Sequence, residues 1–192
     1  MNRKDMMHRN LKLEQMRAKE ENEDLILEGY FAVFDSEYKI TDTMSESIAR
    51  GAFTNTLKDD IDKKVLYNHN PDKILGREKN KTCEFIEDDI GLYVRTKINK
   101  NDTEALNCYE RVKRGDVDQC SISFAIVSEE YSKRGSKHHW TITEVKLFEA
   151  SICVFPAYEE TTVSARQKDV ENMEKRQKEV WEKEMLQKLK GE

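Results

Sequence analysis

The chain has 192 residues, and charged and hydrophobic residues each make up 37% of it. An average globular domain has roughly 25% charged and 45–50% apolar residues, so we expect a folded middle flanked by highly charged ends. No apolar run approaches the roughly 20 residues that span a bilayer, and the N-terminus lacks the apolar stretch of a secretory signal. The sequence therefore predicts a soluble, intracellular protein with no membrane partner.

A net charge of -5 argues against nucleic acid as the main partner, because proteins that bind nucleic acid are usually basic. The four cysteines form no C-x-x-C pair, and each lies among apolar or strand-like residues. We expect reduced, buried thiols rather than a disulfide framework.

Residues 1–24 are mostly polar, and we interpret them as a charged N-terminal tail. At Leu25 the pattern changes: LILEGYFAVF is rich in β-branched and aromatic residues, which favour a strand, and Gly29 indicates a bulge within it. We expect the folded domain to span residues 25–165.

Three shorter patterns follow this strand. Ile48, Phe53 and Leu57 recur at helical spacing and predict a helix with one buried face. KKVLYNHNP predicts a short strand that stops at Pro71, because proline cannot donate to a ladder. TCEFIEDDIGLYVRTKI predicts two strands joined by a tight acidic turn before Gly91.

NDTEALNCYERVKRG, residues 101–115, gives the strongest helix signal. Asn101 is the candidate N-cap, with Glu104 three residues later as in a capping box, and Gly115 is the candidate C-terminal stop. Three strand candidates follow: QCSISFAIV, HHWTITEVKLF and EASICVF. Together these segments predict a mainly β fold with accessory helices, of the α+β class.

Residues 166–192 carry dense charge around a thin apolar stripe. Glu and Lys pairs three or four residues apart support a solvent-exposed helix. Because the stripe is not a sustained heptad, we favour a free helix, a partner-docking segment or a solvated tail over a long coiled coil.

His69 is the histidine best placed for chemistry, because it follows a strand at a point where a side chain can face a cleft. A lone histidine there is also compatible with a purely structural hydrogen bond. In QCSISF, side chains alternate, so Ser121 and Ser123 face one way and Cys120 and Ile122 the other. One serine is a candidate nucleophile if a histidine activates it; otherwise both hydroxyls bind backbone or water.

Glu149 lies within an apolar strand, where a carboxylate is costly unless it is paired. A salt bridge and the orientation of an imidazole explain it equally well. Metal binding is the competing chemistry, but no pair of His or Cys residues shows zinc-site spacing. We expect neither a metal nor another cofactor.

The order of several motifs resembles the prohead maturation protease family of tailed bacteriophages over roughly residues 25–165. These motifs are GAF…L from Gly51, VLYNHNPDKILGR, EDDIGLYV, a helix ending RG, CSISF, and EVKLFEASICVFPAYEETTV. The resemblance implies a serine protease that cleaves capsid and scaffold precursors inside the procapsid. It also implies a closed or bent antiparallel β-barrel like that of the herpesvirus assembly protease.

Carried over by motif, the family's histidine falls on His69 and its serine on Ser121. Asn70 stands where the family usually has an acidic residue, and Ser123 stands where it usually has glycine. The acidic residue of the L-x-E-x-S segment falls on Glu149. We therefore expect Ser121 to be the nucleophile, His69 the general base on a neighbouring strand, and Glu149 the residue that orients the imidazole.

The implied partners are the major capsid protein precursor and its scaffold segment, met inside the assembling procapsid in the host cytoplasm. Self-cleavage and homo-oligomerisation are both compatible with the resemblance. Two alternatives remain open: a catalytically inactive assembly module on the same fold, marked by Ser123 in place of glycine, and a zinc-binding structural protein.

Overall fold

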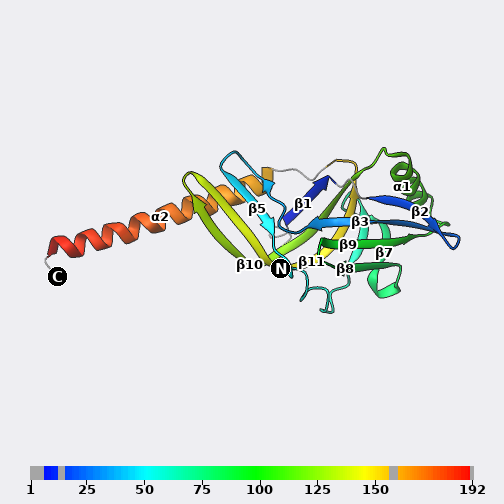
Figure 1. Ribbon diagram of the computed structural model, residues 1–192, viewed down its shortest axis with the longest axis horizontal. Helices are drawn as coiled ribbons and strands as arrows, with labels where there is room; N and C mark the ends of the chain where they lie inside the picture. Colours follow the sequence, from blue (N-terminus) through cyan, green and yellow to red (C-terminus); the bar gives the residue numbers. More distant parts are fainter. Residues whose placement is uncertain (1–6, 13–15, 156–159, 191–192) are drawn as a thin grey trace. The chain divides into compact units, whose positions relative to one another are not determined.

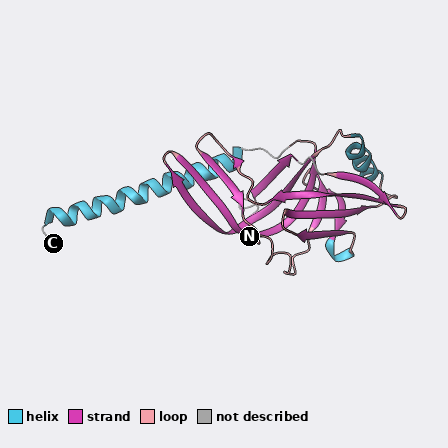
Figure 2. Ribbon diagram, viewed as in Figure 1, coloured by secondary structure: helices cyan, strands magenta, loops and turns pink. Residues whose placement is uncertain are grey.

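Two β-sheets account for most of the folded chain in the computed structural model, which describes residues 7–12, 16–155 and 160–190 (Figure 1). Within these residues, the seven-stranded sheet contains β1 (Met7–Lys12), β10 (Gln119–Arg134), β11 (Lys137–Cys153), β5 (Met44–Ile48), β4 (Tyr38–Lys39), β6 (Lys64–Tyr67) and β7 (Asn70–Arg77). The four-stranded sheet contains, in spatial order, β2 (Arg17–Glu21), β3 (Asp24–Val33), β9 (Gly91–Ile98) and β8 (Cys83–Glu87). The prediction of a mainly β fold with few helices is confirmed (Figure 2).

The predicted closure into a barrel is wrong. In the described part of the chain, β2 and β8 end the four-stranded sheet and pair with no strand of the other sheet. Within the seven-stranded sheet the long strand β11 is paired along both edges: β10 pairs with one edge, and β5 and β6 pair with the other. Both of the latter pairs are parallel, so the seven-stranded sheet is not purely antiparallel.

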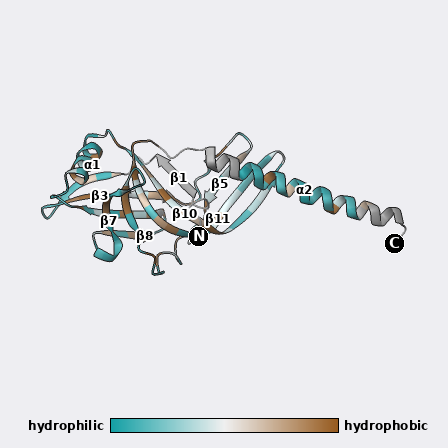
Figure 3. Cartoon of the chain, turned by 180° about the vertical axis from the view of Figure 1, so that it is seen from behind, coloured by the Kyte–Doolittle hydropathy of each residue, from teal (hydrophilic) through white to brown (hydrophobic). Residues whose placement is uncertain are grey.

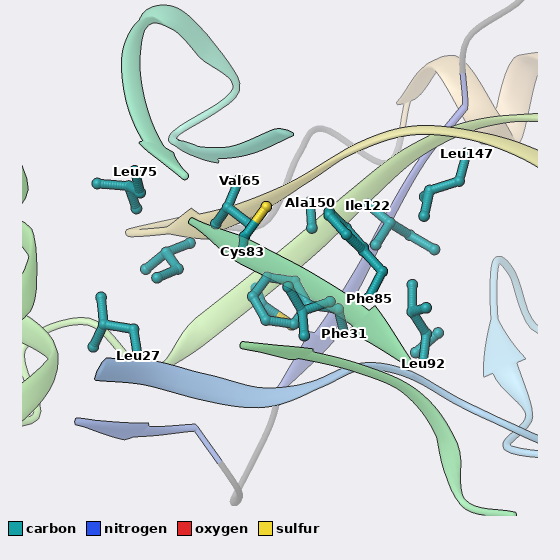
Figure 4. Close-up of a cluster of buried hydrophobic side chains, with 14 of the residues drawn as sticks. Leu27, Phe31, Val65, Leu75, Cys83, Phe85, Leu92, Ile122, Leu147 and Ala150 are labelled. Atoms are coloured by element: carbon teal, nitrogen blue, oxygen red, sulfur yellow. The ribbon is translucent and has the colours of Figure 1, made fainter. Parts of the chain in front are cut away.

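The inner faces of the two sheets share one hydrophobic core (Figure 4). Its buried side chains include Leu27, Phe31, Phe85 and Leu92 from the four-stranded sheet and Val65, Ile122, Leu147 and Ala150 from the seven-stranded sheet. Burial of this apolar surface is the main free-energy gain that holds the two sheets together.

Helix α1 (Thr103–Arg114) lies where the sequence predicts it, but its N-cap is Asp102 rather than Asn101. The Asp102 carboxylate accepts hydrogen bonds from the backbone N–H groups of Glu104 and Ala105, which satisfies two otherwise unpaired donors. Gly115 ends the helix with φ 86°, a left-handed conformation that suits glycine. A short 3₁₀ turn, η2 (Glu78–Asn80), joins β7 to β8.

Several predicted elements differ from the structure. Residues 1–24, expected as a tail, contribute β1 and β2 and the start of β3. The predicted helix around Ile48 and Phe53 is wrong, because Ile48 pairs with Ile142 in the β5–β11 ladder and consecutive turns follow it. The bulge of β3 lies between Tyr30 and Ala32 rather than at Gly29.

The segments predicted as two strands after the loop at 132–137 form the single strand β11. Gly135 adopts φ 62° in the hairpin that connects β10 to β11.

The chain falls into two units, residues 1–157 and residues 158–192. The second unit contains α2 (Glu160–Lys190), whose described surface is mostly hydrophilic (Figure 3). The apolar side chains of Val180 and Trp181 are exposed on it. No helix in the described ranges combines the length and apolar composition that crossing a bilayer requires.

Candidate active site

His69 lies in a two-residue turn between β6 and β7. Tyr67 pairs with Asn70, and the two residues between them, Asn68 and His69, have φ values of 54° and 55°. Positive φ at both central positions defines a type I′ hairpin, for which Asn is a preferred residue and His a tolerated one. The strand was predicted to stop at Pro71, but β7 runs through it. Among the strands that the structure describes, β7 pairs only with β6, so a missing N–H on its other side costs no ladder bond.

Three hydrogen bonds fasten this turn to the end of β11. The Asn68 N–H donates to the carbonyl oxygen of Ile152 at 2.9 Å, and Asn68 Oδ1 accepts from the Val154 N–H at 2.9 Å. The His69 N–H donates to Oγ of Ser151 at 3.1 Å. The backbone of His69 is therefore fixed against the strand that carries Glu149.

His69 and Glu149 form the central pair of the site. His69 Nδ1 lies 2.6 Å from Oε1 of Glu149, although the two residues are 80 positions apart in the sequence. Ser151 donates to the other carboxylate oxygen, Oε2, at 2.7 Å, and Ser123 donates to Oε1. The carboxylate of Glu149 thus accepts hydrogen bonds from a ring nitrogen and two hydroxyl groups.

These contacts determine the ionisation of Glu149, which is only 8% exposed. Burial by itself raises the pKa of this carboxyl group. The hydrogen bond and charge of His69, together with the hydroxyl donors of Ser123 and Ser151, outweigh burial and hold the pKa below its ordinary value of 4.5. Glu149 is therefore an anion at neutral pH.

An anionic Glu149 selects the tautomer of His69. The Nδ1–H donates to the carboxylate, so Nε2 is the ring atom that can accept a proton. Ser123 Oγ lies 3.4 Å from Nδ1, on the carboxylate side of the ring, and its hydroxyl hydrogen is directed at Glu149. Ser123 is thus poorly placed to give a proton to Nε2.

Ser121 lies on the same face of β10, two residues before Ser123. It is opposite Ser151, just as Ser123 is opposite Glu149, and its side chain is fully buried. Its Oγ has no hydrogen-bond partner among the described residues, so no hydrogen bond joins it to His69 here. The two residues were predicted on neighbouring strands, but β11 lies between β10 and the β6–β7 turn.

His138 and His139 form hydrogen bonds with neighbouring hydroxyl groups. His138 Nδ1 lies 2.8 Å from the Tyr131 hydroxyl, and His139 lies between the hydroxyls of Ser45 and Ser47 at 2.9 and 3.0 Å. No cluster of three or more metal-ligating side chains occurs in the described residues.

All four cysteines are buried and reduced. Burial raises the pKa of Cys83, Cys108 and Cys153 to about 12, and it raises the pKa of Cys120 as well. These thiols are therefore poor nucleophiles at neutral pH.

Sequence reasoning assigned no positioning role to Ser151 or to Asn68. Ser151 shares the Glu149 face at a spacing of two, and that alternation was the available signal. Asn68 carried a signal too, because Asn before another polar residue between two strands is typical of a tight hairpin.

Gly76 and Arg77, part of the motif that resembles the prohead proteases, have structural roles. A Cβ atom at Gly76 would overlap Oγ1 of Thr96 and crowd Cβ of Cys83, so glycine suits this close approach. Arg77 forms an ion pair with Asp62 at 2.6 Å.

Comparison with known proteins gives three similarities. The family described as Caudovirus prohead serine protease matches residues 12–176. The prohead protease of Enterobacteria phage HK97 is 29% identical over 150 residues, which cover 78% of this chain and 63% of that protein's length. The bacteriophage T4 capsid assembly protease, gp21, superimposes with a TM-score of 0.49 and 8% identity over 79% of this chain and 98% of that chain.

Proposed function

Because the chain belongs to the Caudovirus prohead serine protease family, we propose that it is a serine endopeptidase that cleaves capsid and scaffold precursors during phage head maturation. Ser121 is the nucleophile, His69 the general base and Glu149 the residue that orients the imidazole. The reaction takes place inside the assembling procapsid, in the host cytoplasm.

The chemistry follows from the protonation state of the His69–Glu149 pair. As Ser121 Oγ attacks the scissile carbonyl carbon, Nε2 of His69 takes the hydroxyl proton and then delivers it to the leaving amine. Water then attacks the acyl-enzyme: Nε2 of His69 takes a proton from the water and returns it to Ser121 Oγ as the acyl group leaves as a carboxylic acid. Throughout, the Glu149 carboxylate accepts the hydrogen bond from Nδ1–H and stabilises the imidazolium that forms.

The observation that carries the proposal is the 2.6 Å contact between His69 Nδ1 and Glu149 Oε1. A buried carboxylate on Nδ1 is what a general-base histidine needs. Ser121 lies on the same face of β10 as Ser123 and is not engaged with this carboxylate. Catalytic hydrogen bonds often form only in the substrate complex. We therefore expect the side chain of Ser121 or His69 to rotate when substrate binds.

The test compares Ser121→Ala with Ser123→Ala in a cell that also expresses the capsid precursor. We expect Ser121→Ala to lower the cleavage rate by about 10⁴-fold or more, because the nucleophile is lost, with no change in melting temperature. Ser123→Ala should cost far less, roughly tenfold, because it removes only a hydrogen-bond donor to Glu149. If both variants lost activity equally, or if only Ser123→Ala lost activity, the assignment of Ser121 as the nucleophile would be wrong.

A serine-directed phosphonate probe separates the enzyme from an inactive assembly module. Labelling of the native protein at Ser121, lost in His69→Ala, supports the protease. A protein that assembles into procapsids but takes up no probe at either serine would be an assembly module, and the proposed catalytic function would be wrong.

A further inference from the structure

Strand β1 lies against the segment of β10 that carries Ser121. Met7–Lys12 pairs antiparallel with residues 119–124, and Asn10 is the residue opposite Ser121. β1 ends the seven-stranded sheet and is paired along one edge only within the described residues. β1 therefore occupies the edge of β10 that is not paired with β11.

The same edge is suited to a polypeptide ligand. An extended peptide can add to an exposed strand edge, where main-chain hydrogen bonds supply affinity without regard to sequence. The other edge of β10 is already paired with β11. This ladder runs from Gln119 opposite Cys153 to Arg134 opposite Lys137. Alongside Ser121, the edge that faces β1 is thus the one place on β10 where a substrate strand can form a ladder.

The composition of β1 fits a strand that can be displaced. Its sequence, MHRNLK, has two apolar residues in six, and a partner attached by one ladder gains little net free energy from each hydrogen bond. A displaced β1 leaves unpaired those N–H and C=O groups of residues 119–124 that point toward it, which is costly unless another strand takes its place. Exchange of one strand for another keeps these groups paired.

We propose that the β10 edge at residues 119–124 binds the substrate polypeptide as an antiparallel strand, and that β1 occupies this edge until substrate displaces it. The inference rests on the proposed protease function, since it assigns the substrate edge of that same site. The occupant is an extended segment of a precursor protein, and β1 is its intramolecular substitute.

A reversible covalent lock tests the proposal in the full-length chain. Lys12 is opposite Gln119, so Lys12→Cys with Gln119→Cys places two thiols on facing positions of β1 and β10. The oxidised double variant should cleave the capsid precursor at least tenfold more slowly than the same variant before oxidation, and dithiothreitol should reverse this loss. Gln119 is also opposite Cys153, so Gln119→Cys alone is the control for a disulfide on the other side of β10.

A binding measurement makes the result independent of catalysis. The probe is a fluorescent peptide with the sequence of residues 5–14, added to the double variant that also carries Ser121→Ala. We expect the reduced protein to bind it and the oxidised protein to bind at least tenfold more weakly.

The outcomes separate the two claims. If the peptide bound only to the reduced protein and neither form cleaved the precursor, the β10 edge would be a peptide-binding site and the proposed protease function would be wrong. Cleavage that is equal in the reduced and oxidised forms, or peptide binding that the lock does not change, would overturn the proposed role of β1. Absence of peptide binding to the reduced protein would overturn it as well.

Discussion

Ser123 donates its hydroxyl hydrogen to Oε1 of Glu149, the same oxygen that lies 2.6 Å from Nδ1 of His69. Ser123 and His69 are therefore joint donors to one carboxylate oxygen, while Ser151 donates to the other. Ser123, which stands where the sequence comparison expects glycine, is thus part of the hydrogen-bond network around His69 and Glu149.

Ser123→Ala removes one of these donors without adding volume. We expect kcat/KM to fall by roughly tenfold, equivalent to about 1.4 kcal/mol of transition-state stabilisation, because the imidazolium is then paired with a less firmly held carboxylate. The pKa of Glu149 should rise towards its ordinary value, since one of the groups that lower it is lost. Steady-state kinetics on a precursor-derived peptide measures the first effect. An unchanged kcat/KM would show that Ser123 only fills space.

The pH dependence of stability should report on Glu149. Its pKa is lower in the folded protein than its ordinary value of 4.5, so the unfolded chain binds this proton more tightly. The interactions of the carboxylate therefore stabilise the fold fully above about pH 4.5, and this contribution is lost as the pH falls through the lowered pKa.

Glu149→Gln isolates this contribution. At pH 7 we expect it to lower the free energy of unfolding by about 1–3 kcal/mol, the cost of losing hydrogen bonds to a charged group. The difference between wild type and variant should shrink as the pH falls below 4.5, as measured by urea unfolding at several pH values. A difference that stays constant from pH 7 to pH 3 would contradict the ionised state of Glu149.

The sequence predicted which side chains share a face of each strand, but not how the strands and turns are arranged around them. Alternation placed Ser121 and Ser123 on one side of their strand and Glu149 and Ser151 on one side of theirs, and the β10–β11 ladder pairs these residues as Ser121–Ser151 and Ser123–Glu149. Alternation is local and needs only the strand. The β6–β7 turn, the continuity of β11 and the pairing of β1 with β10 depend on contacts between distant segments. No local pattern contains those contacts.

The turn that holds His69 gives a matched pair of variants. Asn68 contributes two things: tolerance of φ 54° and an acceptor for the Val154 N–H. Asn68→Gly keeps the first and loses the second, whereas Asn68→Ala loses both. We expect the alanine variant to be less stable than the glycine variant by about 1 kcal/mol, the cost of a left-handed conformation for a residue with a Cβ atom. Thermal unfolding of both variants measures this difference.

Activity of the same pair tests whether the turn positions the base. Both variants should lower kcat more than they raise KM, because His69 moves relative to Glu149 while the β10 edge is untouched. Full activity in Asn68→Ala would mean that the Ser151 contact with the His69 N–H fixes the histidine without help from Asn68.

The last prediction concerns α2, which belongs to the second unit of the chain. At about 1.5 Å per residue, its 31 residues form a rod of about 46 Å. A helix dense in charge with Val180, Trp181 and Met185 exposed has little apolar surface to contribute to a core of its own. We expect a chain truncated after Ala165 to keep its melting temperature and its cleavage of a precursor-derived peptide.

Incorporation into procapsids should fall in the same truncated chain, because an exposed helix that carries a few apolar side chains can dock into a partner's groove. Trp181→Ala in the full-length chain is the finer variant, since it removes the largest exposed apolar side chain and leaves the helix intact. Incorporation is measured as the amount of the protein that co-sediments with procapsids. If truncation instead lowers the melting temperature or causes aggregation, α2 is part of the folded core. Unchanged incorporation of both variants would show that recruitment uses another surface.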